Sequence, residues 1–186
     1  MPVSELRPKS NPDGSFYATW FDDEACLWDD QRLLCPRPLE SVWQPPELRI
    51  HDPAAKATAV LFNPNALAVS QGVRDALSEF AELEFLPVLI RECGIFYILH
   101  VTSAIELPPG SKAMVAPPPS GNIVEVEAFP AFYEPPSAFF RVLQPEGAAA
   151  RRLGATVRAI YLSVEGSQAA LASGAGYLVA RGVGDA

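Results

Sequence analysis

The sequence predicts an α+β fold, a single domain in which two short helices pack on a largely antiparallel sheet and proline-rich segments connect the elements. Three observations predict it. Apolar residues at helical spacing follow Ser70 and again Ser163, and extended apolar runs flank both segments. Two such runs, 85–90 and 95–101, are separated by a turn-sized polar gap, which indicates a β-hairpin. At 186 residues the chain can bury one core without disulfides.

The first predicted helix and the hairpin behind it are the best-defined elements of the chain. Apolar residues of the helix recur at spacings of four, four and three, at Val69, Val73, Leu77 and Phe80. The hydroxyl of Ser70 can cap the helix by accepting a hydrogen bond from an amide of the first turn. We therefore expect this helix to pack its apolar face on the hairpin.

The remaining elements are shorter. Strands are predicted where β-branched and aromatic residues concentrate, at 15–21, 48–50, 58–62, 123–129, 139–143, 157–162 and 177–181. Residues 123–129 alternate apolar and acidic side chains, which is typical of a strand with one wet face. A second helix is expected from Ser163 to about Ser173, where Gly174 would end it.

Prolines mark the connections between these elements. The chain has 19 prolines in 186 residues, roughly twice the average usage. They cluster at 35–38, 44–46, 107–110, 116–119 and 134–136. Because proline interrupts helices and central strands, each cluster predicts a joint.

The segments of the two predicted helices show a weak internal sequence similarity. One offset between 67–77 and 161–171 aligns three residue pairs, Gly72 with Gly166, Ala76 with Ala170 and Leu77 with Leu171. Glycine, alanine and leucine are common residues, so this match alone does not establish a duplication.

Charge and cysteine content narrow the class of partner and the compartment. The 14 basic and 22 acidic residues give a net charge of −8 and a pI near 4.7. This balance argues against nucleic-acid or anionic-membrane binding and suits a basic partner, although acidity also serves solubility. No apolar run approaches the roughly 18 residues of a membrane span, and the N-terminus lacks a signal-peptide pattern. Three cysteines, Cys26, Cys35 and Cys93, lack metal-type spacing, so reduced thiols in a cytoplasm are expected.

The helix and hairpin also carry a family resemblance. Residues 67–70, Val73, Asp75, Leu77, 84–88 and 97–101 resemble the central motif of bacterial immunity proteins, which are encoded beside polymorphic secreted toxins. Segments 43–48 and 160–177 are similar to the flanking parts of that family. The resemblance covers 43–101 and 139–179, whereas residues 1–40 have no placeable counterpart. It implies a protein that binds and neutralises one toxin and does no chemistry.

The catalytic inventory is small. The chain has two histidines, His51 and His100, and the additional ligands that a metal site beside His51 requires are absent or unplaceable. Cys93 and His100 are the least implausible nucleophilic pair, because a hairpin could bring them together. Nothing beside Cys93 would stabilise a thiolate, however. We therefore predict no catalytic residues, no metal site and no cofactor.

The most concentrated polar feature is an acidic–aromatic segment near the N-terminus. We expect its residues to bind the partner: Trp20, Asp22, Asp23, Glu24, Trp28, Asp29 and Asp30. Five acids so close together repel one another unless water or cations meet them, so a solvated loop is the simpler interpretation. As a binding surface, the carboxylates would steer a basic toxin and the aromatic rings would anchor it.

The sequence thus predicts a cytoplasmic, non-enzymatic immunity protein that occludes the active site of a cognate toxin. Two alternatives stay open. One is a small cytoplasmic enzyme using Cys93 and His100, and the other is an interaction module whose partner is not a toxin.

Overall fold

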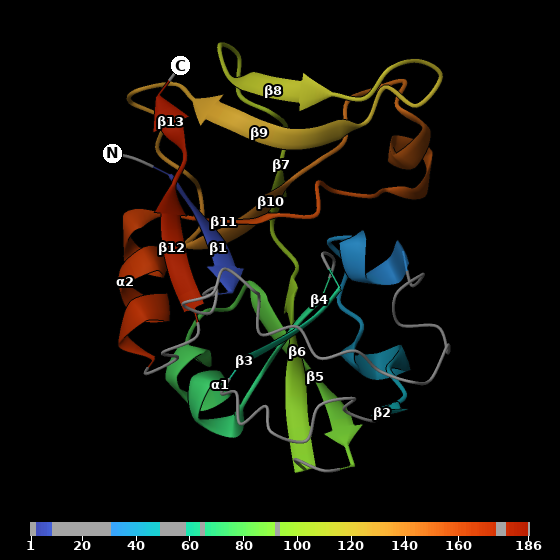
Figure 1. Ribbon diagram of the computed structural model, residues 1–186, viewed down its shortest axis with the longest axis vertical. Coiled ribbons are helices and arrows are strands. Elements are labelled where there is room, and N and C mark those ends of the chain that lie inside the picture. The colour runs from blue at the N-terminus through green and yellow to red at the C-terminus, as the bar shows by residue number, and fades with distance from the viewer. Residues whose placement is uncertain are drawn as a thin grey trace, which may run out of the picture.

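The computed structural model describes residues 3–8, 31–48, 59–63, 66–91, 94–173 and 178–185. These residues form the predicted α+β fold, with three sheets, mostly antiparallel, and two short α-helices in a single body (Figure 1). The strand predicted at 15–21 lies outside the described residues. No helix within those ranges has both the length and the apolar character needed to cross a membrane.

The first sheet is built on the predicted hairpin. Its order is β2-β5-β6-β4-β3, with β2 (Glu47–Leu48), β3 (Ala59–Asn63), β4 (Ala66–Val69), β5 (Leu83–Ile90) and β6 (Gly94–Val101). All its pairings are antiparallel except the parallel contact of β2 with β5.

The helix α1 (Gln71–Leu77) is capped by Ser70, as predicted: the Ser70 hydroxyl accepts a hydrogen bond from the Val73 amide at 3.5 Å. Val73 and Leu77 are buried. The helix is shorter than predicted, because Val69 is the last residue of β4 and Phe80 follows the helix end. Extended backbone at Ser70, with ψ of 167°, separates strand from helix, so the apolar spacing crosses a boundary that periodicity cannot locate.

Pro87 lies in the middle of β5, where it cannot donate a ladder hydrogen bond. It pairs with Tyr97 of β6, while β2 joins the other edge of β5 only at Leu89 and Ile90. The Pro87 carbonyl instead accepts the indole N–H of Trp43 at 2.8 Å. The proline is therefore tolerated, and it ties the preceding segment to the sheet.

The second sheet has the order β12-β1-β11-β10-β7, formed by β1 (Ser4–Pro8), β7 (Ala104–Ile105), β10 (Phe139–Val142), β11 (Ile160–Leu162) and β12 (Leu178–Gly182). The helix α2 (Val164–Ala172) follows β11. Its cap is Ser163, whose hydroxyl accepts from the Gly166 amide at 3.2 Å. The predicted second helix is confirmed, whereas β11 is shorter than the predicted 157–162.

The two sheets repeat one arrangement. In the first, β4 leads through a serine cap into α1 and then β5, which pairs with β6. In the second, β11 leads through a serine cap into α2 and then β12, which pairs with β1. The order β5-β6-β4-β3 thus matches β12-β1-β11-β10, and all these pairings are antiparallel. Because β1 stands where β6 stands, the second unit is a circular permutation of the first.

The residue alignment of this structural repeat is shifted by one position from the internal similarity in the sequence. The two caps align Ser70 with Ser163, so the buried Val73 of α1 corresponds to the buried Gly166 of α2. The alignment of Gly72 with Gly166 is therefore wrong. The strand–cap–helix order repeats, although the residues that match in the sequence are offset by one position when the two caps are aligned.

The third sheet has the order β13-β9-β8, formed by β8 (Lys112–Val115), β9 (Ile123–Phe129) and β13 (Gly184–Asp185). It lies at the upper end of the molecule in Figure 1. Its inner face packs on the second sheet through a buried cluster formed by Val3, Ile123, Val126, Phe129, Phe140, Val142, Val157 and Tyr161.

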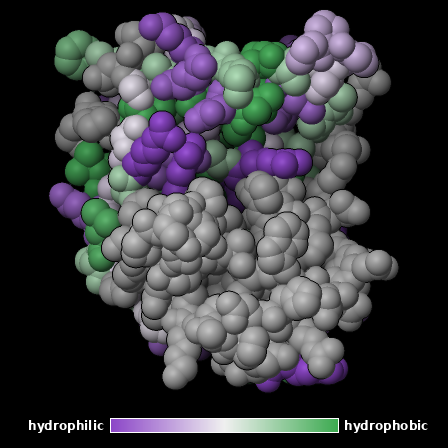
Figure 2. Space-filling view, in the orientation of Figure 1, coloured by the Kyte–Doolittle hydropathy of each residue, from purple (hydrophilic) through white to green (hydrophobic). Residues whose placement is uncertain are grey.

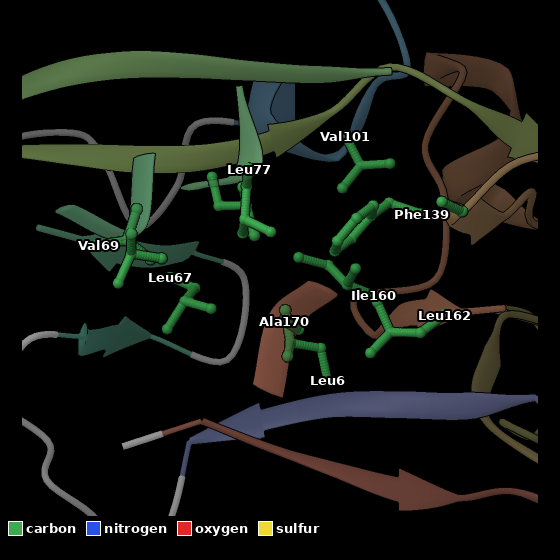
Figure 3. Packing of buried hydrophobic residues seen from close by; sticks show 12 residues of the cluster. Leu6, Leu67, Val69, Leu77, Val101, Phe139, Ile160, Leu162 and Ala170 are labelled. Carbon is green, nitrogen blue, oxygen red and sulfur yellow. The ribbon is translucent and has the colours of Figure 1, made fainter. Parts of the chain in front are cut away.

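The main core joins both helices to the first two sheets. Figure 3 shows its side chains converging from β1, β4, β6, β10, β11 and both helices, with Leu6, Leu67, Val69, Leu77, Val101, Phe139, Ile160, Leu162 and Ala170 labelled. The repeated units therefore share one core.

Candidate partner-binding surface

The predicted partner-binding segment, from Trp20 to Asp30, lies outside the described residues. The same holds for Cys93 and His51. His100 and several exposed surfaces lie within the described residues.

His100 lies in the core rather than at a surface, with 1% of its area exposed. Its Nε2 is 2.9 Å from the Arg37 carbonyl oxygen, and its buried Nδ1 has no hydrogen-bond partner. Burial is the main cause that lowers the pKa of His100 below its ordinary 6.5. At neutral pH the ring is therefore an uncharged donor to Arg37, which fits a structural role.

Glu84 lies opposite His100 in the β5–β6 pairing and contacts the segment that contains Arg37. Its carboxylate accepts hydrogen bonds from the amides of Leu39 and Glu40 at 2.8 and 2.5 Å, and thereby caps the 3₁₀-helix η2 (Glu40–Val42). These bonds fasten residues 31–48 to the first sheet. The Leu34 carbonyl accepts the Thr156 amide at 2.9 Å, so the same segment also reaches the second half of the chain.

Arg141 of β10 is a buried cation that sequence reasoning missed. Its Nη1 donates to the carbonyls of Val157 and Arg158 at 3.3 and 2.6 Å, and its Nε has no partner. Burial lowers the pKa of Arg141 to about 10, so it stays charged at neutral pH. The guanidinium satisfies carbonyls just before β11 begins. A single arginine inside the apolar run 139–143 was the signal in the sequence.

Within the described residues, no group of three or more histidine, cysteine or acidic side chains is placed to hold a metal ion.

The third sheet exposes apolar side chains. Met114 and Val115 of β8 and Val124 of β9 are 45%, 53% and 53% exposed. The pairing register skips Val124 and Glu127, so β9 carries an extra residue at two points and both extra residues are exposed. Figure 2 shows hydrophobic side chains among hydrophilic ones at this end of the molecule.

Phe132 is the most exposed large apolar residue among those described, at 92%. It stands in a turn after β9 in which the Tyr133 amide donates to the Pro130 carbonyl at 2.9 Å. The Tyr133 ring stacks on Phe129, with centroids 5.6 Å apart and planes 13° apart. Because Phe129 belongs to the core, this stacking fixes the turn that presents Phe132 to solvent.

A cavity of about 300 Å³ lies beside this turn, between residues 133–138 and the start of α2. Its lining includes Tyr133, Pro135 and Val164, and two exposed acids, Glu134 and Glu165. We call this cavity the α2 groove. Both acids that line it are exposed to solvent.

A scan against protein-family models and a search of curated proteins matched nothing to this chain. The resemblance to immunity proteins therefore rests on the sequence motifs of the helix and hairpin alone.

Proposed function

We propose that the chain is an immunity protein that binds one secreted bacterial toxin and neutralises it by covering the active site or the substrate path. It acts by binding and performs no turnover. It works in the cytoplasm of the producing cell, needs no cofactor and binds no nucleic acid. Its partner presents a basic surface, which a chain with a net charge of −8 attracts over the distance of a Debye length.

The observation that carries this proposal is apolar surface held on rigid backbone. Met114 and Val124 lie on paired strands, and Phe132 lies in a hydrogen-bonded turn. Exposed apolar groups on ordered elements lose little conformational entropy on binding, so they serve as anchors. The helix–hairpin motif of α1, β5 and β6 supports the toxin-binding interpretation by its resemblance to immunity proteins.

The enzymatic alternative depends on His100 and Cys93. The burial of His100 and its bond to Arg37 disfavour a part in catalysis, because a general base must reach its substrate. Co-expression with the toxin also tests the third alternative, an interaction module whose partner is not a toxin.

The test uses the protein encoded by the gene beside this one. The two proteins are co-expressed in a sensitive host, and their complex is measured by titration calorimetry. We expect restored growth and a one-to-one complex, and Cys93→Ala should protect as well as the wild type. If growth stays arrested although the chain is expressed in soluble form, and the two proteins do not bind, the proposed function as an immunity protein for this toxin is rejected. Loss of protection in a Cys93→Ala chain that still binds would favour the enzyme.

A further inference from the structure

We infer that the α2 groove receives an arginine side chain of the partner protein, while Phe132 enters an apolar pocket of that partner. This inference rests on the proposed function and specifies the chemistry of the contact. Phe132 directly precedes Tyr133, the first residue that lines the cavity, so the two contacts belong to one stretch of the chain.

The groove is preformed. The Ser163 amide donates to the Ala138 carbonyl at 2.9 Å, which fastens the start of α2 to the lead-in of β10. Gly166 lies against the same carbonyl so closely that an added Cβ would stand 2.2 Å from its oxygen. The Ser137 hydroxyl lies 2.8 Å from that of Ser103. Little of this backbone has to be ordered when a ligand enters, so binding costs little conformational entropy.

The charge of the groove is negative and uncompensated. Glu134 lies on the loop side and Glu165 on the helix side, and no residue that lines the cavity is basic. Within the described part of the chain, neither carboxylate forms an ion pair or a hydrogen bond. Glu165 lies in the first turn of α2, where the helix dipole stabilises its negative charge. Its side chain is exposed there, so a cation can still reach the carboxylate.

The walls of the groove favour a guanidinium over an ammonium. Tyr133, Pro135 and Pro136, which line the loop side of the cavity, contribute apolar ring surfaces. A guanidinium is planar and weakly hydrated, so it can stack on such surfaces while its edges donate to carboxylates. Exposed ion pairs contribute little affinity by themselves, so the acids orient the partner and speed its approach. Phe132 supplies the buried contact that slows dissociation.

The first experiment tests the groove without any toxin. Backbone amide resonances are followed while acetyl-Leu-Arg-Leu-amide is added, with the citrulline peptide, which is isosteric and uncharged, as the control. We expect the arginine peptide alone to move the resonances of Ser137, Ser163 and Glu165. The double variant Glu134→Gln, Glu165→Gln should abolish the difference between the peptides. Equal responses to the two peptides, or shifts scattered over the whole acidic surface, would overturn the inference.

The second experiment uses the protein encoded by the adjacent gene. Phe132→Ala should weaken the complex by about 30-fold, as expected for a 2 kcal/mol anchor. The double glutamine variant should slow association at low salt and less at high salt. Leu171→Ala is the matched control, because Leu171 is an exposed apolar residue at the far end of the same helix and should leave the affinity unchanged.

The two experiments separate the inference from the proposed function. If the wild type neither binds nor protects, the proposed function fails, and the peptide titration decides the groove alone. If the wild type binds and protects, and the Phe132 and glutamate variants associate with the toxin and dissociate from it at the wild-type rates, the function stands and the groove inference is wrong.

Discussion

The close contact between α2 and the lead-in of β10 predicts opposite effects of one substitution at two helical glycines. An ideal Cβ at Gly166 would lie 2.2 Å from the Ala138 oxygen and 2.9 Å from its carbonyl carbon. At Gly72, in the first turn of α1, the nearest atom to such a Cβ is the Ser70 hydroxyl at 4.0 Å. Alanine therefore meets fixed backbone in α2 and open space in α1.

The expected magnitudes follow from this difference. Alanine favours a helix over glycine by about 1 kcal/mol, and this gain is available at both positions. At Gly166 the backbone must move by more than about 1 Å to restore ordinary contact, which strains the Ser163–Ala138 hydrogen bond. Overpacking of this kind costs about 1–3 kcal/mol or more. Gly72→Ala should therefore raise the free energy of unfolding by up to about 1 kcal/mol, and Gly166→Ala should lower it by about 1–3 kcal/mol.

Urea denaturation followed by tryptophan fluorescence measures both free energies, and equal m-values would show that the same cooperative unit unfolds in each variant. Wild-type stability in Gly166→Ala, or the same change in both variants, would refute the close packing of α2 on the second sheet.

Three further predictions concern the core, pH and the acidic–aromatic segment. Leu77→Ala should lower the free energy of unfolding by about 2–5 kcal/mol, because Leu77 is fully buried, while the exposed Leu171→Ala should have little effect; equal midpoints would place Leu77 outside the core. Because the folded pKa of His100 lies below its unfolded value of 6.5, the unfolded chain binds more protons between the two values, so stability should fall as pH drops below about 6.5. His100→Asn should flatten that slope, and an unchanged slope would show that His100 does not titrate differently on folding. Neutralising the four aspartates of 22–30 should slow toxin association chiefly at low salt, and Trp28→Ala should speed dissociation; unchanged rates would make the segment an ordinary solvated loop.

Local signals predicted the elements that local chemistry determines. Ser70 and Ser163 both cap helices, and the two apolar runs pair as the antiparallel strands β5 and β6 of the predicted hairpin. The proline clusters at 107–110 and 116–119 flank β8, as expected for joints. In each case the deciding interaction spans a few residues, so spacing and residue type carry the information.

Elements that depend on distant partners were missed. The residues of β1 are mixed in polarity, and they form a strand because β11 and β12 flank them on both sides. Val69 fits the apolar spacing of the helix in the sequence, yet it is the last residue of β4, because β4 pairs with β3 and β6. The α2 groove brings together residues 133–138 and 163–165, and no sequence pattern joins those segments. The repeated topology was equally hidden, because the permutation places β1 at the opposite end of the chain from β12.

The most direct test of the central claim is a titration of toxin activity with purified chain. A binding-only immunity protein should abolish the activity of the toxin linearly, ending at one chain per toxin, and toxin recovered from the complex should have unchanged mass and full activity. Inhibition completed well below that ratio, or a recovered toxin that is chemically altered, would contradict the account, because either result requires turnover by the chain.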